Sequence, residues 1–172
     1  GHHDIGFVAG PRSSWSSRER LGGMRTATAS QGVRLVELGH FSPTYEGGRD
    51  AAAGVVASGA TAVVAYNDLC AIGLMSALRE RGVEVPKDLS VVGIDDIEMS
   101  AMLHPALTTV DVPKADLGRT AVDFLLRALA DPASRPRHVA LTTRLVVRNT
   151  TAPPPVSVRH VRRPVAQRLG AS

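Results

Sequence analysis

Short apolar runs alternate along this chain of 172 residues with longer segments whose apolar residues recur at helical spacing. The apolar runs predict strands at 5–9, 33–38, 61–66, 89–94 and 107–110, with a last extended segment at 139–147. Helical spacing predicts helices at 13–30, 43–58, 68–81 and 115–130. Strands that alternate with helices and are apolar on both faces predict an α/β fold with an open, mostly parallel, doubly wound sheet.

The positive charge of the chain is concentrated at its C-terminal end. Residues 153–172 contain four arginines and no acid, which accounts for the whole net charge of +4. Residues 1–152 are therefore neutral overall and give no global electrostatic reason to bind nucleic acid. The tail begins with three prolines, and we expect it to be disordered. A solvated terminus is favoured over a nucleic-acid-binding arm.

Compartment signals are few and consistent. A single cysteine, Cys70, excludes an intramolecular disulfide and is typical of a reducing compartment. The longest apolar stretch is shorter than the roughly 20 residues of a membrane helix, and no charged-then-apolar leader opens the chain. We therefore expect a cytoplasmic protein. Because the first residue is Gly1 and not Met, we expect the natural N-terminus to lie upstream.

Polar and aromatic residues follow the expected strands at the point where each strand ends. Arg18, Phe41, Asn67 and Asp95 lie in or near these loops, and open parallel sheets bind ligands outside the carboxyl ends of their strands. A carboxylate accepts hydrogen bonds from two hydroxyls, a guanidinium offers a fork of donors, and an amide does both. An aromatic face covers the apolar side of a sugar ring. The sequence therefore predicts a site for a small polyhydroxylated ligand.

Each of these residues also has a structural interpretation. Asn67 can cap the helix that follows it. Arg18 can be a solvated surface residue, and Phe41 can pack at the rim of the core. Asp68 and Asp96 are interpreted as acids at helix starts and not as ligands. The combination at one edge therefore weighs more than any single member.

The patterns of catalytic and metal sites are missing from the sequence. Gly-x-Gly-x-x-Gly, Gly-x-x-x-x-Gly-Lys and Gly-x-Ser-x-Gly do not occur. The six histidines show no metal-ligand spacing, and Cys70 lies among apolar positions as expected of a buried thiol. We expect no metal and no cofactor. An enzyme on a similar sheet remains an alternative that lacks a nucleophile–base pair.

Several short motifs, in this order and spacing, resemble the LacI/GalR transcriptional regulators over about residues 1–152. They are Gly-His-x-x-Ile-Gly-Phe-Val-Ala-Gly-Pro at 1–11, Arg-x-Arg-Leu-x-Gly at 18–23, Asn-Asp-x-x-Ala-x-Gly at 67–73, Pro-x-Asp-Leu-Ser-Val-Val-Gly-Ile-Asp-Asp at 86–96, Pro-x-Leu-Thr-Thr-Val at 105–110 and Arg-Asn-Thr-Thr at 148–151. The resemblance implies a periplasmic-binding-protein-like effector domain of two lobes. In that family a sugar-like effector changes operator affinity allosterically.

The resemblance also implies roles for individual residues. The effector contacts of the family fall on Arg18, Phe41, Asn67 and Asp95, with Ser14 a weaker candidate. Ile72 and Leu103 match positions at the family's dimer face and imply a homodimer; the alternative is that both are ordinary core residues, which for Ile72 is supported nearly as well. Val112 stands where many members have Gln, so one polar contact between the lobes is in doubt.

The same resemblance implies how much of a regulator this chain contains. Residues 1–152 correspond to the C-terminal part of the effector domain, which is the C-terminal lobe plus a crossing segment at about 110–135. Most of the N-terminal lobe and the helix-turn-helix that contacts operator DNA are expected to be missing. We therefore expect the ligand-sensing part of a repressor that is not an enzyme. The alternative is a secreted or periplasmic sugar-binding protein of the same fold.

Overall fold

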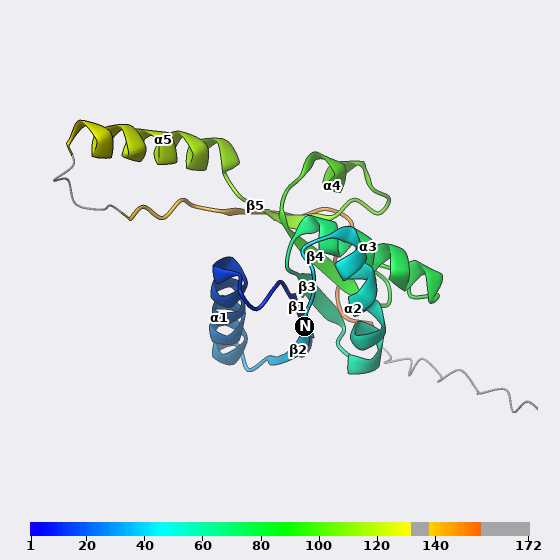
Figure 1. Cartoon of the computed structure of the whole chain (residues 1–172). Helices are drawn as coiled ribbons and strands as arrows, with labels where there is room; N and C mark the ends of the chain where they lie inside the picture. The colour runs from blue at the N-terminus through cyan, green and yellow to red at the C-terminus, as the bar shows by residue number, and fades with distance from the viewer. Residues whose placement is uncertain (132–137, 156–172) are drawn as a thin grey trace, which may run out of the picture.

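The computed structural model describes residues 1–131 and 138–155. Over these residues one sheet of six strands forms in the order β2-β1-β3-β4-β5-β6 (Figure 1). The strands are β1 (Asp4–Ala9), β2 (Arg34–His40), β3 (Ala62–Ala65), β4 (Ser90–Asp95), β5 (Thr108–Asp111) and β6 (Arg144–Val146). The helices are α1 (Trp15–Ser30), α2 (Tyr45–Ser58), α3 (Asp68–Glu80), α4 (Glu98–Met102) and α5 (Lys114–Ala130).

The sheet has the parallel character that the sequence predicts. Strands β1 to β5 pair in parallel, and β6 alone runs antiparallel, along β5. The carboxyl ends of strands β1 to β5 therefore lie together at one edge of the sheet. The prediction of an α/β fold with an open, mostly parallel sheet is confirmed.

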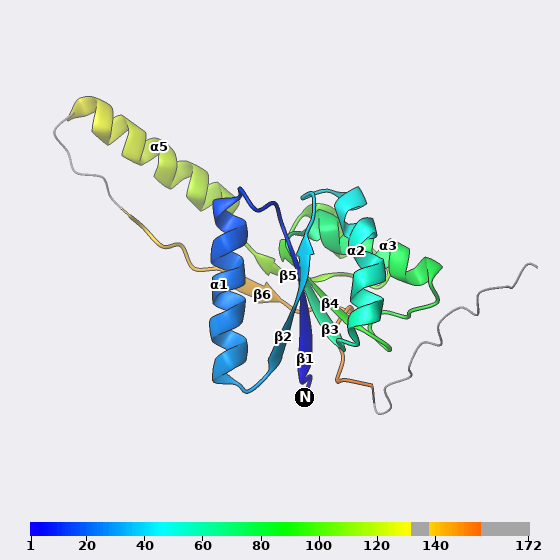
Figure 2. The same cartoon turned by 60° about the horizontal axis from the view of Figure 1, so that its bottom comes forward.

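Helices cover both faces of the sheet, as Figure 2 shows from a second direction. Helices α2 and α3 lie on one face, and α1 lies on the other, against β1 and β2. Between α3 and the sheet, Val63, Val91, Leu74 and Leu78 have no exposed surface. Burying an aliphatic side chain of this size stabilises the fold by about 1.5–3 kcal/mol.

Helix α3 has the sequence signals of a well-defined helix. The Asn67 side chain accepts a hydrogen bond from the Cys70 amide and caps the first turn. Gly82, with φ of 74°, follows the last turn in the left-handed conformation that glycine adopts most readily. These signals place Asn67 and Asp68 at the carboxyl end of β3.

Helices α2 and α3 approach each other closely through glycines. A Cβ on Gly48 would lie closer than 3.0 Å to the Cys70 carbonyl oxygen, and a Cβ on Gly73 would meet the Tyr45 carbonyl oxygen in the same way. The close approach holds the first turn of α3 against the start of α2. It thereby contributes to placing Asn67 at the strand-end edge.

Helix α5 extends away from the rest of the domain (Figures 1 and 2). It has no buried residue, and Leu117, Leu125 and Leu129 are more than half exposed. Strand β6 is shorter than the predicted segment 139–147, and the single-turn α4 has no signal in the sequence that predicts it. The predicted disorder of 153–172 falls almost entirely outside the described residues. No described helix is both long and apolar enough to cross a bilayer.

Candidate functional site

Arg20 connects three chain segments at the carboxyl-end edge of the sheet. From α1, its Nη2 donates to Asp95 Oδ1 over 3.3 Å, and its Nη1 donates to the Tyr66 carbonyl oxygen over 2.5 Å. Its guanidinium carbon lies 4.7 Å from the centre of the Tyr66 ring. An ion pair, a hydrogen bond and a cation–π contact therefore hold this side chain between α1, β3 and β4.

Three hydroxyl groups gather next to Arg20. The Tyr66 hydroxyl lies 2.9 Å from Ser16 Oγ and 3.2 Å from Ser14 Oγ. Ser14 is also the N-cap of α1, where its Oγ accepts from the Ser17 amide. The hydrogen bonds to Ser14 and Ser16 lower the pKa of the Tyr66 phenol. The cluster offers both donors and acceptors to a hydroxylated ligand.

Asp95 presents its carboxylate from an unusual turn at the end of β4. Asp95 and Asp96 have φ angles of 120° and 47°, which residues other than glycine seldom adopt. The Asp95 side chain is 34% exposed. Its burial raises the pKa of the carboxyl, and the charges of Arg20 and Lys114 oppose that rise. Lys114, at the start of α5, donates to the Asp95 carbonyl oxygen.

The structure places the other predicted site residues in different ways. Ser14 and Asp95 both reach the Arg20–Tyr66 cluster. Asn67 lies at the same edge, but its Oδ1 accepts from the Cys70 amide and its Nδ2 donates to the Pro43 carbonyl oxygen over 3.1 Å. The capping interpretation of this residue is therefore confirmed.

The side chains of Arg18 and Phe41 take no part in the hydrogen bonds of that cluster. Arg18 is exposed, and its Nη1 makes 3.5 Å contacts with the carbonyl oxygens of Arg12 and Ser13. Phe41 is half-buried and packs against the core. Sequence reasoning missed Arg20 and Tyr66. Arg20 stands two positions after Arg18 in the same motif, and residues two apart lie on different sides of a helix. Only the rotation of α1 about its axis shows which arginine faces Asp95.

The two acids interpreted as helix starts have further partners. Asp68 is the first residue of α3, as expected, but it is fully buried. Asp96 precedes α4 without being part of it, so its interpretation as a helix-start acid is wrong. Its Oδ1 accepts from Arg148 Nη2 over 2.7 Å, and Arg148 also donates to the Leu107 carbonyl oxygen. This pair attaches the returning chain to the strand-end turn.

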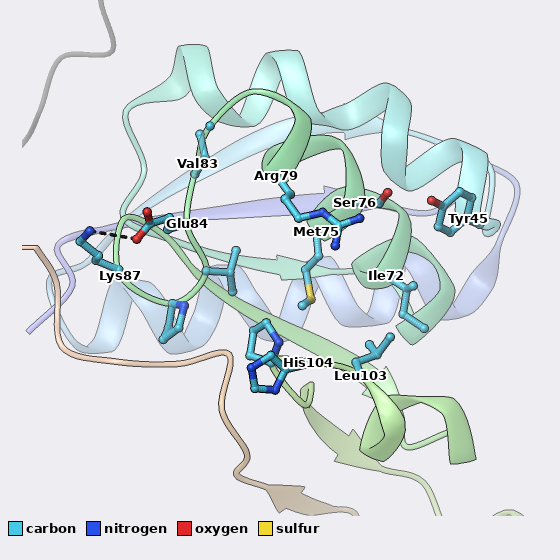
Figure 3. A pocket seen from close by; sticks show the side chains of 14 residues that line it. Tyr45, Ile72, Met75, Ser76, Arg79, Val83, Glu84, Lys87, Leu103 and His104 are labelled. Atoms are coloured by element: carbon cyan, nitrogen blue, oxygen red, sulfur yellow. Dashed lines mark hydrogen bonds and ion pairs between the residues drawn. The ribbon is translucent and has the colours of Figure 1, made fainter.

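A groove of about 750 Å³ lies along α3, outside the strand-end cluster (Figure 3). Ile72 and Leu103, the two predicted interface residues, line it together with Met75. Ile72 is only 9% exposed and also packs in the core. The Glu84–Lys87 ion pair, 2.9 Å long, stands at the far end of the groove. Among the described residues no three His, Cys, Asp or Glu side chains gather as a metal site would require.

The sequence of this chain matches a known protein family over most of its length. Residues 1–151 match the family described as periplasmic binding protein-like domain. The PurR transcriptional repressor of Vibrio campbellii is 34% identical over 158 residues, which are 87% of this chain and 46% of that protein. The ribose operon repressor of Haemophilus influenzae is 33% identical, over 87% of this chain and 46% of that protein. The chain therefore spans about half the length of these relatives.

Solved structures agree in fold. A LacI family transcriptional regulator from Enterococcus faecium with bound ribose has a TM-score of 0.80 and 32% identity, over 89% of this chain and 58% of that one. The CelR–cellobiose complex has a TM-score of 0.81 and 29% identity, over 87% and 47%. A dimeric Lac repressor has a TM-score of 0.82 and 35% identity, over 90% and 57%.

Proposed function

Because this chain belongs to the periplasmic binding protein-like domains of the LacI/GalR type, we propose that it is the ligand-sensing part of a transcriptional repressor. The observation that supports this best is the polar cluster around Arg20, Tyr66 and Asp95 at the carboxyl-end edge of the sheet. The two relatives compared above are named as repressors, which favours sensing over transport.

We propose a sugar or related polyol as the effector. The Asp95 carboxylate would accept from two ligand hydroxyls, while the Ser14, Ser16 and Tyr66 hydroxyls would both donate and accept. Arg18, Asn67 and Phe41 are proposed as further contacts from the same edge. Relatives of the chain have been solved with ribose and with cellobiose, which are both rich in neighbouring hydroxyls.

The proposed mechanism is allosteric. A ligand held at the edge by this lobe would also contact a second lobe in the longer protein, and its different contacts in the open and closed states supply the coupling energy. Such couplings are typically about 1–3 kcal/mol. The bond from Lys114 to the Asp95 carbonyl oxygen ties the start of α5 to the turn at the ligand site. Residues 1–152 would then be the C-terminal lobe with its crossing segment.

A second copy of this chain is proposed to occupy the groove along α3. One solved neighbour is a dimeric Lac repressor, and the groove of this chain offers Ile72, Met75 and Leu103 as its apolar centre. A two-fold interface repeats one patch on both subunits, so such a groove suits self-association. Operator DNA would be contacted only by a helix-turn-helix elsewhere in the longer protein. We propose that the whole regulator works in the cytoplasm.

Calorimetric titration of the chain with D-ribose and cellobiose tests the ligand class. We expect weak binding, since one lobe lacks the opposing wall, and two or three lost hydrogen bonds of about 1.5 kcal/mol each move a micromolar ligand toward the millimolar range. Asp95→Asn should weaken binding about tenfold or more. Arg25→Ala, which removes only the surface pair of α1 with Glu37, should leave it unchanged. Equal affinity of Asp95→Asn and the unchanged chain would contradict the site.

Sedimentation tests the groove. Leu103→Asp puts a charge in the apolar centre and should give a folded monomer. Met99→Asp changes an exposed apolar residue of α4 that does not line the groove and should leave the dimer intact. A dimer that survives Leu103→Asp would reject this interface.

A further inference from the structure

We propose that Asp68 is a positioning residue, which holds the Asp95–Asp96 turn in the conformation that presents the Asp95 carboxylate to the ligand. The proposal rests on the proposed function for the ligand, but the geometry of the turn can be tested without any ligand. Asp68 belongs to a different element from the turn, because it is the first residue of α3. Its influence on the site would be indirect, through hydrogen bonds.

Asp68 is a fully buried carboxylate whose hydrogen-bond partners come from β5, from α4 and from the residue just before α4. Its Oδ2 accepts from Ser100 Oγ over 2.6 Å and from the Ile97 amide over 2.9 Å. Its Oδ1 accepts from Thr109 Oγ1 over 2.5 Å. A buried carboxylate destabilises the fold unless its oxygens accept hydrogen bonds. Moving these three donors away would therefore cost free energy, and this cost keeps them in place.

Thr109 extends the influence of Asp68 to the turn itself. Its Oγ1 donates to Asp68 and is also the acceptor of the Asp96 amide, over 3.4 Å. The turn is thus held at two successive amides, that of Asp96 through Thr109 and that of Ile97 directly by Asp68. Positive φ angles at residues other than glycine persist only where the surroundings enforce them. These two bonds are such an enforcement.

The fold makes room for this carboxylate directly behind the turn. A Cβ on Gly93, two residues before Asp95, would lie closer than 3.0 Å to Asp68 Oδ1. The helix itself does not need Asp68 as its cap, because Asn67 already performs that role. The burial of Asp68 and its bonds are therefore explained by the turn, and not by helix capping alone.

A matched pair of variants separates this role from general packing. Thr109→Val removes the hydroxyl that links Asp68 to the Asp96 amide while keeping the shape, and Thr109→Ser keeps the hydroxyl. Three-bond couplings and nuclear Overhauser effects measured by NMR on the labelled chain report the φ angles of Asp95 and Asp96. We expect Thr109→Val and Asp68→Asn to lose the positive φ at Asp96, and Thr109→Ser to keep it.

The outcomes decide the proposal without a ligand. Positive φ at both aspartates in a folded Thr109→Val or Asp68→Asn chain would overturn it. If Asp68→Asn does not fold, the Thr109 pair still decides.

Titration of the same variants with D-ribose and cellobiose tests the consequence for the ligand. We expect Thr109→Val to weaken binding about tenfold and Thr109→Ser to stay within about twofold. If the unchanged chain binds neither sugar, the proposed ligand class fails while the NMR result still decides the role of Asp68. If sugars bind and Thr109→Val retains full affinity, the positioning role for the ligand is refuted while the proposed function stands.

Discussion

Replacing Gly48 by alanine should destabilise this domain, although alanine is the better helix former. Gly48 is buried in α2, and a Cβ at this position would lie closer than 3.0 Å to the Cys70 carbonyl oxygen of α3. A backbone oxygen cannot turn away as a side chain can, so the two helices must separate. Because Cys70 is in the first turn of α3, the separation would also displace Asn67.

The magnitude follows from two opposing effects. Overpacking of a well-filled interior costs about 1–3 kcal/mol and occasionally more. Alanine loses less backbone entropy than glycine when the helix forms, and this difference stabilises the variant by about 0.5–1 kcal/mol. The difference is a net loss of up to about 2.5 kcal/mol, or up to roughly 10 °C in Tm for a domain of this size, and the contact with a backbone oxygen places Gly48→Ala toward the upper end.

Gly54 provides the matched control on the same helix. A Cβ there would meet no atom within 4 Å, so Gly54→Ala should keep only the entropic gain and raise the stability by about 0.5–1 kcal/mol. Thermal and urea unfolding followed by circular dichroism measures both variants. If Gly48→Ala proves as stable as Gly54→Ala, the close approach of α2 and α3 is not a constraint and the reasoning is refuted.

Three further predictions concern the site and its surroundings. Tyr66→Phe removes the half-buried hydroxyl bonded to Ser14 and Ser16 and should lower the free energy of unfolding by about 0.5–1.5 kcal/mol, measured by urea denaturation. Asp95→Asn should raise Tm at pH 7. Burial raises the pKa of the Asp95 carboxyl, so its protonated form favours folding below the ordinary pKa, and that contribution is lost as the pH rises through the raised pKa of the folded chain. Asparagine is neutral at every pH, so the gain in Tm over the unchanged chain should vanish in acid. Burial raises the pKa of the Cys70 thiol to about 11, so iodoacetamide should label it slowly at pH 7 until urea unfolds the chain.

Much of the fold could be predicted because its signals are local. The run from Asn67 to Gly82 combines a capping side chain, apolar residues at helical spacing and a terminating glycine, and the structure has α3 there. Strands buried on both faces are continuous apolar runs, as in β3. The segments that differ from the prediction lack such signals. Helix α4 is a single turn, and most of the segment predicted at 139–147 is not strand.

The order of strands and helices, and with it the edge where polar residues gather, could be predicted from the chain alone. That is a consequence of chain connectivity and of the rule that parallel strands end on one side. Which side chains meet at that edge depends on how the elements pack in three dimensions. The rotation of α1 directs Arg20 and not Arg18 to Asp95, and Tyr66, just after β3, meets Ser14 at the start of α1. Asp68 is buried because Thr109 and Ser100, far away in sequence, supply its donors. Such partnerships depend on orientation in space, which periodicity along the chain does not encode.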